Sequence, residues 1–183
     1  KKRAISDEVI NYCIFKNIIY ESHEYHNTVF VGYDTKGAAK YAALRGIWMS
    51  KPFKSEVSGS NKKYCFSIPP KVKSETLIVT ESAIDALSVA TLRAIPFNVH
   101  YLSLGGVYIP KDNIMKAKFP TSLSWYLNSR PNINKVILCL DNDDVGRKAA
   151  KFIGHTLSDQ GYFVSDRPPE IGKDYNDLIL LNF

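Results

Sequence analysis

Short apolar runs alternate with amphipathic segments through the second half of the chain. The strand-like runs are TLIVT (76–80), NVHYLSL (98–104), KVILCL (135–140) and YFVSD (162–166). Apolar residues recur at helical spacing in the segments between them, which are 82–94, 121–129 and 144–160. Continuous apolar strands separated by amphipathic helices are typical of βαβ units. The pattern therefore predicts an α/β fold with a mostly parallel, buried, four-stranded sheet and flanking helices.

The first third of the chain has a different pattern and predicts a small α+β domain. Ser6-Asp7-Glu8 is a helix start, and residues 28–47 resemble a hairpin whose turn is Asp34–Gly37 and whose return strand begins at Tyr41. The segment YCFSI, 64–68, is the clearest of the short strand-like pieces that follow. Pro69-Pro70 and a polar stretch then mark a boundary. We expect a basic α+β domain over 1–74 and a second domain over 75–183.

Charge is distributed unevenly along the chain. The net charge is +6, and residues 1–76 carry all of it, with thirteen Lys and Arg against seven acids. A basic segment beside a neutral one is typical of a nucleic-acid contact region joined to a core, although solvated lysines give the same pattern. No run approaches the ~18 apolar residues that a membrane span needs. We expect no signal peptide, reduced cysteines and a cytoplasmic location.

Acidic residues follow two of the predicted strands. Glu81 comes directly after TLIVT, and Asp141 and Asp143 follow KVILCL. If the two strands are neighbours, these carboxylates converge, because ligands in such sheets bind beyond the carboxyl ends of the strands. Carboxylates this close repel one another, and Mg²⁺ or Mn²⁺ is the partner that suits hard oxygen ligands. Helix capping is the alternative role for these acids, and Asp144 is expected to begin the next helix.

Three motifs in this order resemble the Toprim domain, which bacterial primases, topoisomerases and certain nucleases share. They are ESAIDALS from Glu81, the glycine pair in SLGG, and LDNDDVGRKAA. The resemblance covers about 77–165 and implies a Rossmann-like sheet. It also implies that Glu81 is a general acid or base, or a metal ligand, and that Asp141 and Asp143 hold Mg²⁺. The family's usual glycine after the glutamate is Ser82 here, which still permits a tight turn.

Both ends of the chain make the resemblance more specific. GKDYNDLI, 172–179, resembles the closing motif of primase-like Toprim proteins and implies that Asp174 returns to the metal edge. The N-terminal part resembles an uncharacterised domain that precedes Toprim in many plasmid and transposon proteins. Such proteins often carry a zinc ribbon further upstream. We therefore expect a fragment of a longer protein from a mobile element.

Further residues are candidates for binding phosphate or nucleic acid, each with an ordinary structural alternative. Backbone N–H groups of a glycine pair can approach a phosphate, or the pair can be a plain loop. Basic residues can contact template or nucleotide, or form salt bridges and a solvated face. Asp85, one helical turn after Glu81, either supports the site or is solvated. The candidates are Arg45, Lys62, Lys63, Gly105, Gly106 and Arg147.

The resulting hypothesis is a metal-dependent phosphoryl transferase that joins ribonucleotides on single-stranded DNA, a DNA primase-like activity. Its expected partners are single-stranded DNA, nucleoside triphosphates, and a helicase or relaxase. A Toprim nuclease would use the same acids and metal with water as nucleophile. A module that binds DNA or a relaxase without catalysis is the alternative outside the enzymes, and an intact Glu81 and DxD pair disfavours it.

Overall fold

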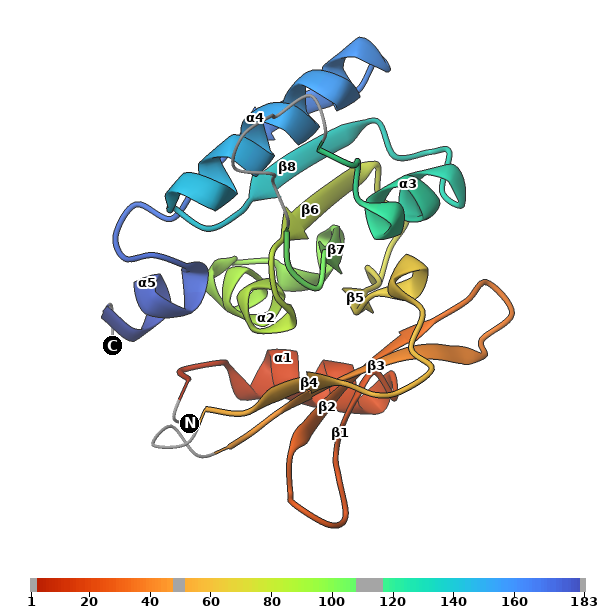
Figure 1. The fold of residues 1–183 in the computed structure, drawn as a ribbon, viewed down its shortest axis with the longest axis vertical. Coiled ribbons are helices and arrows are strands. Elements are labelled where there is room, and N and C mark those ends of the chain that lie inside the picture. The colour runs from red at the N-terminus through yellow and green to blue at the C-terminus, as the bar shows by residue number, and fades with distance from the viewer. Residues whose placement is uncertain (1–2, 48–51, 108–116, 182–183) are drawn as a thin grey trace.

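Two β-sheets form the framework of the chain, which the computed structural model describes over residues 3–47, 52–107 and 117–181. The N-terminal sheet has the order β1-β2-β3-β4, with antiparallel neighbours throughout. The C-terminal sheet has the order β5-β7-β6-β8-β9. Helix α2 packs on the C-terminal sheet and against α1, which belongs to the N-terminal unit (Figure 1). The two units therefore share an interior.

The elements of the N-terminal unit are α1 (Asp7–Phe15), β1 (Ile19–Glu21), β2 (Thr28–Tyr33), β3 (Ala39–Arg45), β4 (Lys54–Glu56) and the 3₁₀ turn η1 (Lys62–Tyr64). The strands of the C-terminal sheet are β5 (Ser67–Ile68), β6 (Thr76–Thr80), β7 (His100–Ser103), β8 (Lys135–Cys139) and β9 (Phe163–Asp166). Its helices are α2 (Ala83–Leu92), the 3₁₀ turn η2 (Pro96–Asn98), α3 (Thr121–Asn128), α4 (Asp144–Asp159) and α5 (Tyr175–Leu181).

The N-terminal unit is an α+β unit, as the sequence pattern predicts, but some of its elements begin or end at other residues. Ser6 caps α1 by accepting a hydrogen bond from the Val9 backbone N–H at 3.3 Å. The return strand of the hairpin begins at Ala39, two residues earlier than predicted. The strand-like segment 64–68 does contain a strand, but a shorter one, because only Ser67–Ile68 pair. Asn61 accepts from the Lys63 N–H at 3.0 Å and starts η1 instead, since such local side-chain bonds compete with extended structure.

The predicted parallel sheet is confirmed, with one addition. β7, β6, β8 and β9 are parallel neighbours, and their order reverses at β6. The fifth strand, β5, pairs antiparallel with β7 at the edge, with Ser67 opposite Leu102. β5 comes from the segment before the boundary expected at residue 74.

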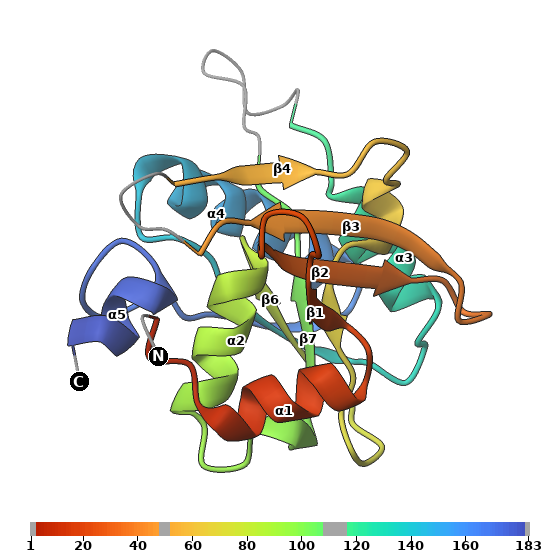
Figure 2. The same ribbon diagram turned by 90° about the horizontal axis from the view of Figure 1, so that it is seen from below.

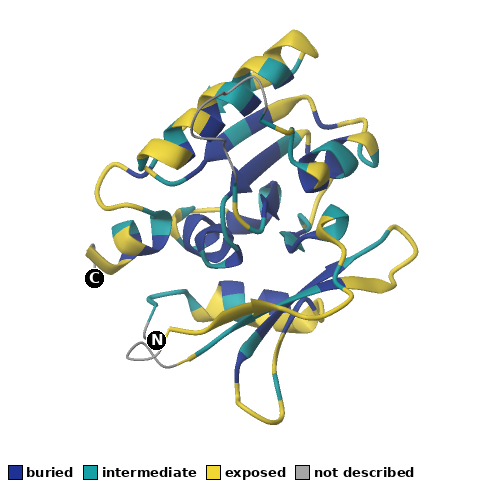
Figure 3. Cartoon of the chain, in the orientation of Figure 1, coloured by how far each residue is buried: buried dark blue, intermediate teal, exposed yellow. Residues whose placement is uncertain are grey.

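Alternate residues of the central strands face two different layers. Leu77 and Val79 of β6 pack with α3 and α4, whereas Ile78 packs with α1, α2 and Phe30 of β2. Period-2 alternation explains this, because successive side chains of a strand point to opposite faces. Figure 2 shows the N-terminal sheet and α1 lying across one side of the C-terminal unit. Figure 3 shows buried residues concentrated along the central strands and on α2.

Helix α4 covers the outer face of the C-terminal sheet and is apolar on one side only. Its buried positions Ala149, Ala150, Ile153 and Leu157 have helical spacing, and Lys148 and Lys151 are exposed. Across 3–47, 52–107 and 117–181, no helix combines the length and the apolar character that crossing a bilayer requires.

Candidate functional site

Glu81 and Asp141 follow two neighbouring strands at the point where the strand order reverses. β6 pairs in parallel with β7 on one side and with β8 on the other. Thr80 lies opposite Cys139 in the register, so Glu81 comes level with Leu140, one residue short of Asp141. Ligands of open α/β sheets bind at such a switch point, beyond the carboxyl ends of the strands. The topology thus puts both acids where a ligand of this fold class is expected.

A cleft of about 470 Å³ opens at this edge, between the C-terminal sheet and the N-terminal sheet. One wall comes from β3 and β4 and includes Tyr41, Arg45, Lys54 and Glu56. The opposite wall holds the acids of the C-terminal unit together with one lysine: Glu81, Asp85, Asp141, Asp174 and Lys173. Gly105 and Gly106 also line the cleft. Residues predicted from five separate parts of the sequence are therefore brought to one cavity.

The positive partner of the DxD pair in the structure is a lysine. The Lys173 ammonium nitrogen Nζ lies 3.2 Å from Asp143 Oδ2 and 3.6 Å from Asp141 Oδ2. Within the three described segments, no group of three His, Cys, Asp or Glu side chains is arranged to hold a metal ion. The donors themselves suit a divalent cation, because they are carboxylates that crowd one another at one edge. Lys173 stands between the two aspartates that the sequence assigns to that cation.

Two of the predicted metal ligands also cap helices. Asp143 is the N-cap of α4, and its Oδ1 accepts from the Gly146 N–H at 2.8 Å. Asp174 precedes α5, and its Oδ1 accepts from the Asp177 N–H at 2.7 Å. Each carboxylate has a second oxygen, so capping leaves part of its acceptor capacity available. The capping role and the site role are compatible at both positions.

The acids differ in how readily they ionise. Burial, with the charges of Asp141 and Asp143, raises the pKa of Glu81 to about 7. Burial and the charge of Asp174 also raise the pKa of Asp141, with Lys173 opposing. The Gly146 N–H and Lys173 lower the pKa of Asp143 despite some desolvation. Near neutral pH the site combines a firmly ionised Asp143 with a Glu81 that exchanges its proton.

Asp85 is part of the site rather than solvated. It is 4% exposed, and its Oδ1 has no hydrogen-bond partner among the described residues. Its Oδ2 accepts from the Ser82 hydroxyl at 2.6 Å, and Ser82 in turn caps α2 through the Asp85 N–H at 3.3 Å. Burial, with Asp174 and Asp141 nearby, raises the pKa of Asp85 to about 6, although the Ser82 bond opposes this. The serine in the place of the family glycine thus gives α2 a side-chain cap.

Arg147 binds protein groups, and not the cleft. Its Nη1 forms two bonds to the Asp166 carboxylate, at 2.8 and 3.0 Å. Its Nε and Nη2 donate to the carbonyls of Asp141 and Leu140, at 3.1 and 2.9 Å. The guanidinium therefore joins the ends of β8 and β9 to α4. With its donors engaged in this way, Arg147 holds the backbone of Asp141 and does not face a phosphate in the cleft.

The glycine pair offers no free N–H group to a phosphate. Gly106 N–H donates to the Glu81 carbonyl at 3.0 Å, and Gly105 N–H donates to Ser103 Oγ at 3.2 Å. Both glycines have a positive φ, +67° at Gly105 and +99° at Gly106, which few other residues adopt readily. Their role in the structure is to turn the chain after β7 and to hold the backbone of Glu81.

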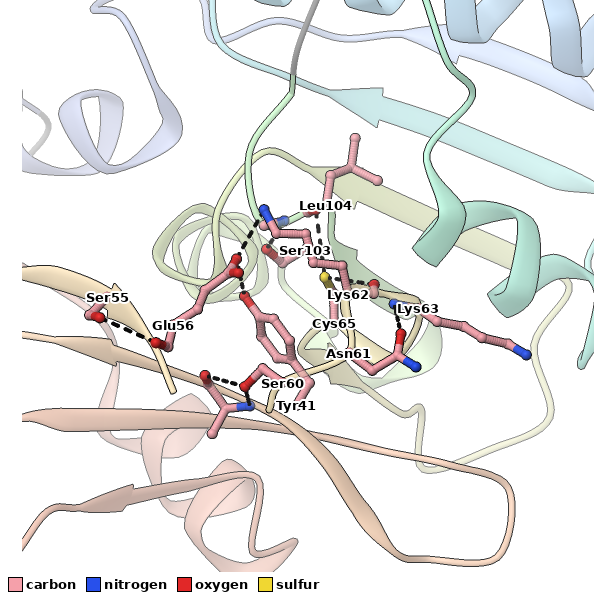
Figure 4. Close-up of polar contacts among 12 residues, drawn as sticks. Tyr41, Ser55, Glu56, Ser60, Asn61, Lys62, Lys63, Cys65, Ser103 and Leu104 are labelled. Carbon is pink, nitrogen blue, oxygen red and sulfur yellow. Dashed lines mark hydrogen bonds and ion pairs between the residues drawn. The ribbon is translucent and has the colours of Figure 1, made fainter. Parts of the chain in front are cut away.

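Gly105 also lets the two units approach closely. A Cβ at this position would lie 3.1 Å from Cys65 Sγ and 3.2 Å from the Tyr41 hydroxyl oxygen. Tyr41 donates to Glu56 Oε1 at 3.2 Å, and Lys62 Nζ pairs with the same oxygen at 3.1 Å (Figure 4). These residues form a polar junction where the N-terminal sheet meets the loop after β7.

The predicted basic residues of the N-terminal unit lie in three different places. Arg45 lies at the end of β3 and lines the cleft, opposite the acids. Lys62 is bound to Glu56 and lines a second cavity of about 410 Å³, beside α3 and α4. Lys63 is half-buried, with its ammonium 5.6 Å from the Tyr64 ring centroid, and it lines neither cavity. Arg45 is therefore the predicted cation that shares the cleft with the acids.

Sequence reasoning did not single out Gly146, Lys54 or Lys173 as site residues, and it left the role of Asp85 undecided. A Cβ on Gly146 would lie 2.2 Å from the Asp141 carbonyl oxygen, so only glycine fits there. The available signal was a glycine in the first turn of a strong helix. Glycine lowers helix stability, so its presence there indicates close packing against a neighbouring group. Lys54 carried no signal of its own among many lysines.

Two family models match the chain, one in each unit. Residues 78–179 match the family described as Toprim-like, and residues 1–73 match a family described as a protein of unknown function, DUF3991. No curated protein matches the sequence. The Toprim-like match contains Glu81, the DxD pair and Asp174. The order of the two matches confirms the resemblance drawn from the motifs.

Solved structures of primases have a similar fold. The primase fragment of the bacteriophage T7 primase-helicase protein is 20% identical with a TM-score of 0.65, over 99% of this chain and 67% of that chain. The DnaG primase catalytic domain bound to single-stranded DNA is 16% identical with a TM-score of 0.62, over 98% and 65%. The primase catalytic core of E. coli is 17% identical with a TM-score of 0.59, over 98% and 66%.

The chain thus spans about two thirds of the length of these structures, and at such identities the likeness concerns the fold. The fold in question includes both units, because nearly the whole chain is superposed. With the Toprim-like model covering more than half of the residues, the chain belongs to the Toprim-like family.

Proposed function

We propose that the chain is the catalytic core of a primase-like enzyme that joins ribonucleotides on single-stranded DNA. The proposal includes the expected origin on a mobile element and a helicase or relaxase as partner. One observation supports it above all. The cleft sets the acids at the carboxyl edge of the C-terminal sheet opposite Arg45 and Lys54 of the N-terminal sheet. Such a cavity suits a phosphate backbone on one wall and phosphoryl transfer on the other.

The acids of the cleft have separate roles in this proposal. Asp141 and Asp143, with Asp174 at the same edge, would hold Mg²⁺ or Mn²⁺, and Glu81 would either join these ligands or act as the proton acceptor. The divalent ion supplies charge stabilisation for the attacking and leaving oxygens. Glu81 is suited to accept the proton of the attacking hydroxyl, because burial and neighbouring acids raise its pKa to about 7. Arg45 and Lys54 would bind template or nucleotide phosphates.

Asp143→Asn is the variant that tests this function most cleanly. Asparagine is as good an N-cap as aspartate, so α4 keeps its cap while the site loses one charge. Asp159→Asn, at the exposed far end of the same helix, is the matched control. Labelled single-stranded DNA is incubated with the four ribonucleotides and Mg²⁺ or Mn²⁺, and the products are separated on a denaturing gel.

New short products from the wild type and Asp159→Asn, absent with Asp143→Asn, are the expected result. Shortening of the template in the same pattern would replace the primase proposal by the nuclease. The binding module has one observation in its favour, since Lys173 already compensates Asp141 and Asp143. DNA binding without either product would contradict both enzyme proposals and support that module.

A further inference from the structure

Lys173 is attached to the DxD segment through its backbone. The Lys173 carbonyl accepts from the N–H of Asn142, the residue between the two aspartates, at 2.7 Å. The Lys173 N–H donates to Asp177 Oδ2 at 3.0 Å. Gly172 makes this turn with φ +82°, and a Cβ on it would lie 2.6 Å from Asp177 Cβ. The main chain at Lys173 is thus fixed relative to Asp141 and Asp143.

The side chain of Lys173 is much less constrained than its backbone. It is 59% exposed, although its ammonium contacts both aspartates, and it lines the cleft. Asp141 is only 12% exposed at its side chain, and the ammonium lies 3.6 Å from its Oδ2. A flexible four-carbon stem allows an ammonium to leave such a position without moving the backbone.

We propose that Lys173 is an exchangeable counter-ion, which occupies the position between Asp141 and Asp143 until a divalent cation displaces it into the cleft. This inference rests on the proposed function, because it takes Asp141 and Asp143 as metal ligands. Without the ammonium, two carboxylates at this edge would repel each other. With a divalent cation bound, the ammonium is repelled by it and remains in the cavity, where phosphate oxygens of a nucleotide would attract it.

Displacement predicts that removing the ammonium strengthens metal binding. Mn²⁺ affinity is measured by electron paramagnetic resonance on the wild type, Lys173→Gln, Lys173→Arg and Asp143→Asn, without nucleic acid. Lys54→Gln is the matched control, because this substitution removes the same charge from the same cleft. Among the described residues, Lys54 forms no ion pair with Asp141 or Asp143. We expect Lys173→Gln to bind Mn²⁺ about tenfold more tightly, and Lys54→Gln within about twofold of wild type.

Lys173→Arg keeps the charge and is expected to bind no more tightly than wild type. The shift of the melting temperature on adding Mn²⁺ gives a second readout, which is expected to be larger for Lys173→Gln than for wild type. Unchanged or weaker binding by Lys173→Gln would overturn the inference, because the lysine would then support the metal ligands. Equal tightening by Lys54→Gln would also overturn it, since general electrostatics would suffice.

A failure of the proposed function would give a different result in these experiments. If neither the wild type nor any variant binds Mn²⁺, both the metal site and the displacement are contradicted. If the wild type binds and Asp143→Asn does not, the metal site stands, and only the comparison of Lys173→Gln with Lys54→Gln decides the displacement.

Discussion

At the scale of single residues, the cleft holds more acid than its one paired lysine neutralises. Glu81, Asp85 and Asp141 all have raised pKa values because burial and neighbouring carboxylates disfavour their charged forms. A group whose folded pKa lies above its unfolded value stabilises the fold below the unfolded pKa and loses that contribution as the pH rises through the folded pKa. For Glu81 this window runs from 4.5 to about 7.

We therefore expect the metal-free protein to lose stability between pH 5 and pH 7.5, and Glu81→Gln to lose less. The difference in unfolding free energy should be about 1–2 kcal/mol, after allowance for solvent screening of a partly exposed carboxyl. Urea denaturation at both pH values measures it, with exposed Glu170→Gln as control. Identical pH slopes for wild type and Glu81→Gln would contradict the raised pKa.

At the scale of elements, the start of α4 is packed tightly on the end of β8. Asp143 caps the helix, Arg147 binds the Asp141 and Leu140 carbonyls, and Gly146 leaves room for the Asp141 carbonyl. The position of Asp141 in the site thus depends on close backbone contact with the first two turns of the helix.

Gly146→Ala should disrupt this contact. Its Cβ would meet the Asp141 carbonyl carbon at 2.9 Å as well as the oxygen at 2.2 Å, which are backbone atoms that cannot rotate away. We expect a loss of about 2–3 kcal/mol in unfolding free energy. Gly154→Ala in the same helix is the control, since its Cβ would lie 3.6 Å from Leu138 Cδ1 in ordinary contact. That variant should be neutral or up to about 1 kcal/mol more stable, because alanine favours helix.

Sequence patterns predicted the elements of the C-terminal sheet because each is strongly periodic over its own length. The strands β6 and β8 and the helix α4 were found in this way, and the acids at their ends followed from the rule for parallel sheets. The roles of Lys173 and Asp85 did not follow. They depend on how the segment before α5 returns to the sheet edge and on how deeply the first turn of α2 is buried. Both are features of the tertiary structure that local sequence patterns do not contain. The engagement of Arg147 and of the glycine N–H groups depends on local hydrogen bonds that no pattern records.

At the scale of the whole molecule, the cleft exists because the two units meet. The N-terminal sheet supplies its basic wall, and Tyr41 of that sheet lies close to the Gly105 loop beside the cleft. The uneven distribution of charge along the sequence thus corresponds to the arrangement of the two units. The basic unit faces the acidic edge of the neutral one.

Binding of single-stranded DNA should accordingly depend on salt through the cleft cations. Arg45→Ala and Lys54→Ala should each weaken binding and reduce the slope of log affinity against log salt by about 0.7, the value for one single-strand phosphate contact. Lys135→Ala is the control, since Lys135 begins β8 at the opposite end of the strand from the acids. Fluorescence anisotropy between about 50 and 200 mM salt measures the slopes. Slopes equal to that of Lys135→Ala would contradict the cleft as the binding surface.

The short strand β5 has a consequence for how this protein can be divided. The two family models meet between residues 73 and 78, yet β5 precedes that point and completes the C-terminal sheet beside β7. Phe66 and Ile68, at 1% and 0% exposure, are part of the shared core. A chain shortened to begin at residue 75 would leave β7 as an open edge, which favours aggregation. The exchange of one half between relatives would have to preserve this strand pairing, so we expect the two halves to be inherited and to diverge as one unit.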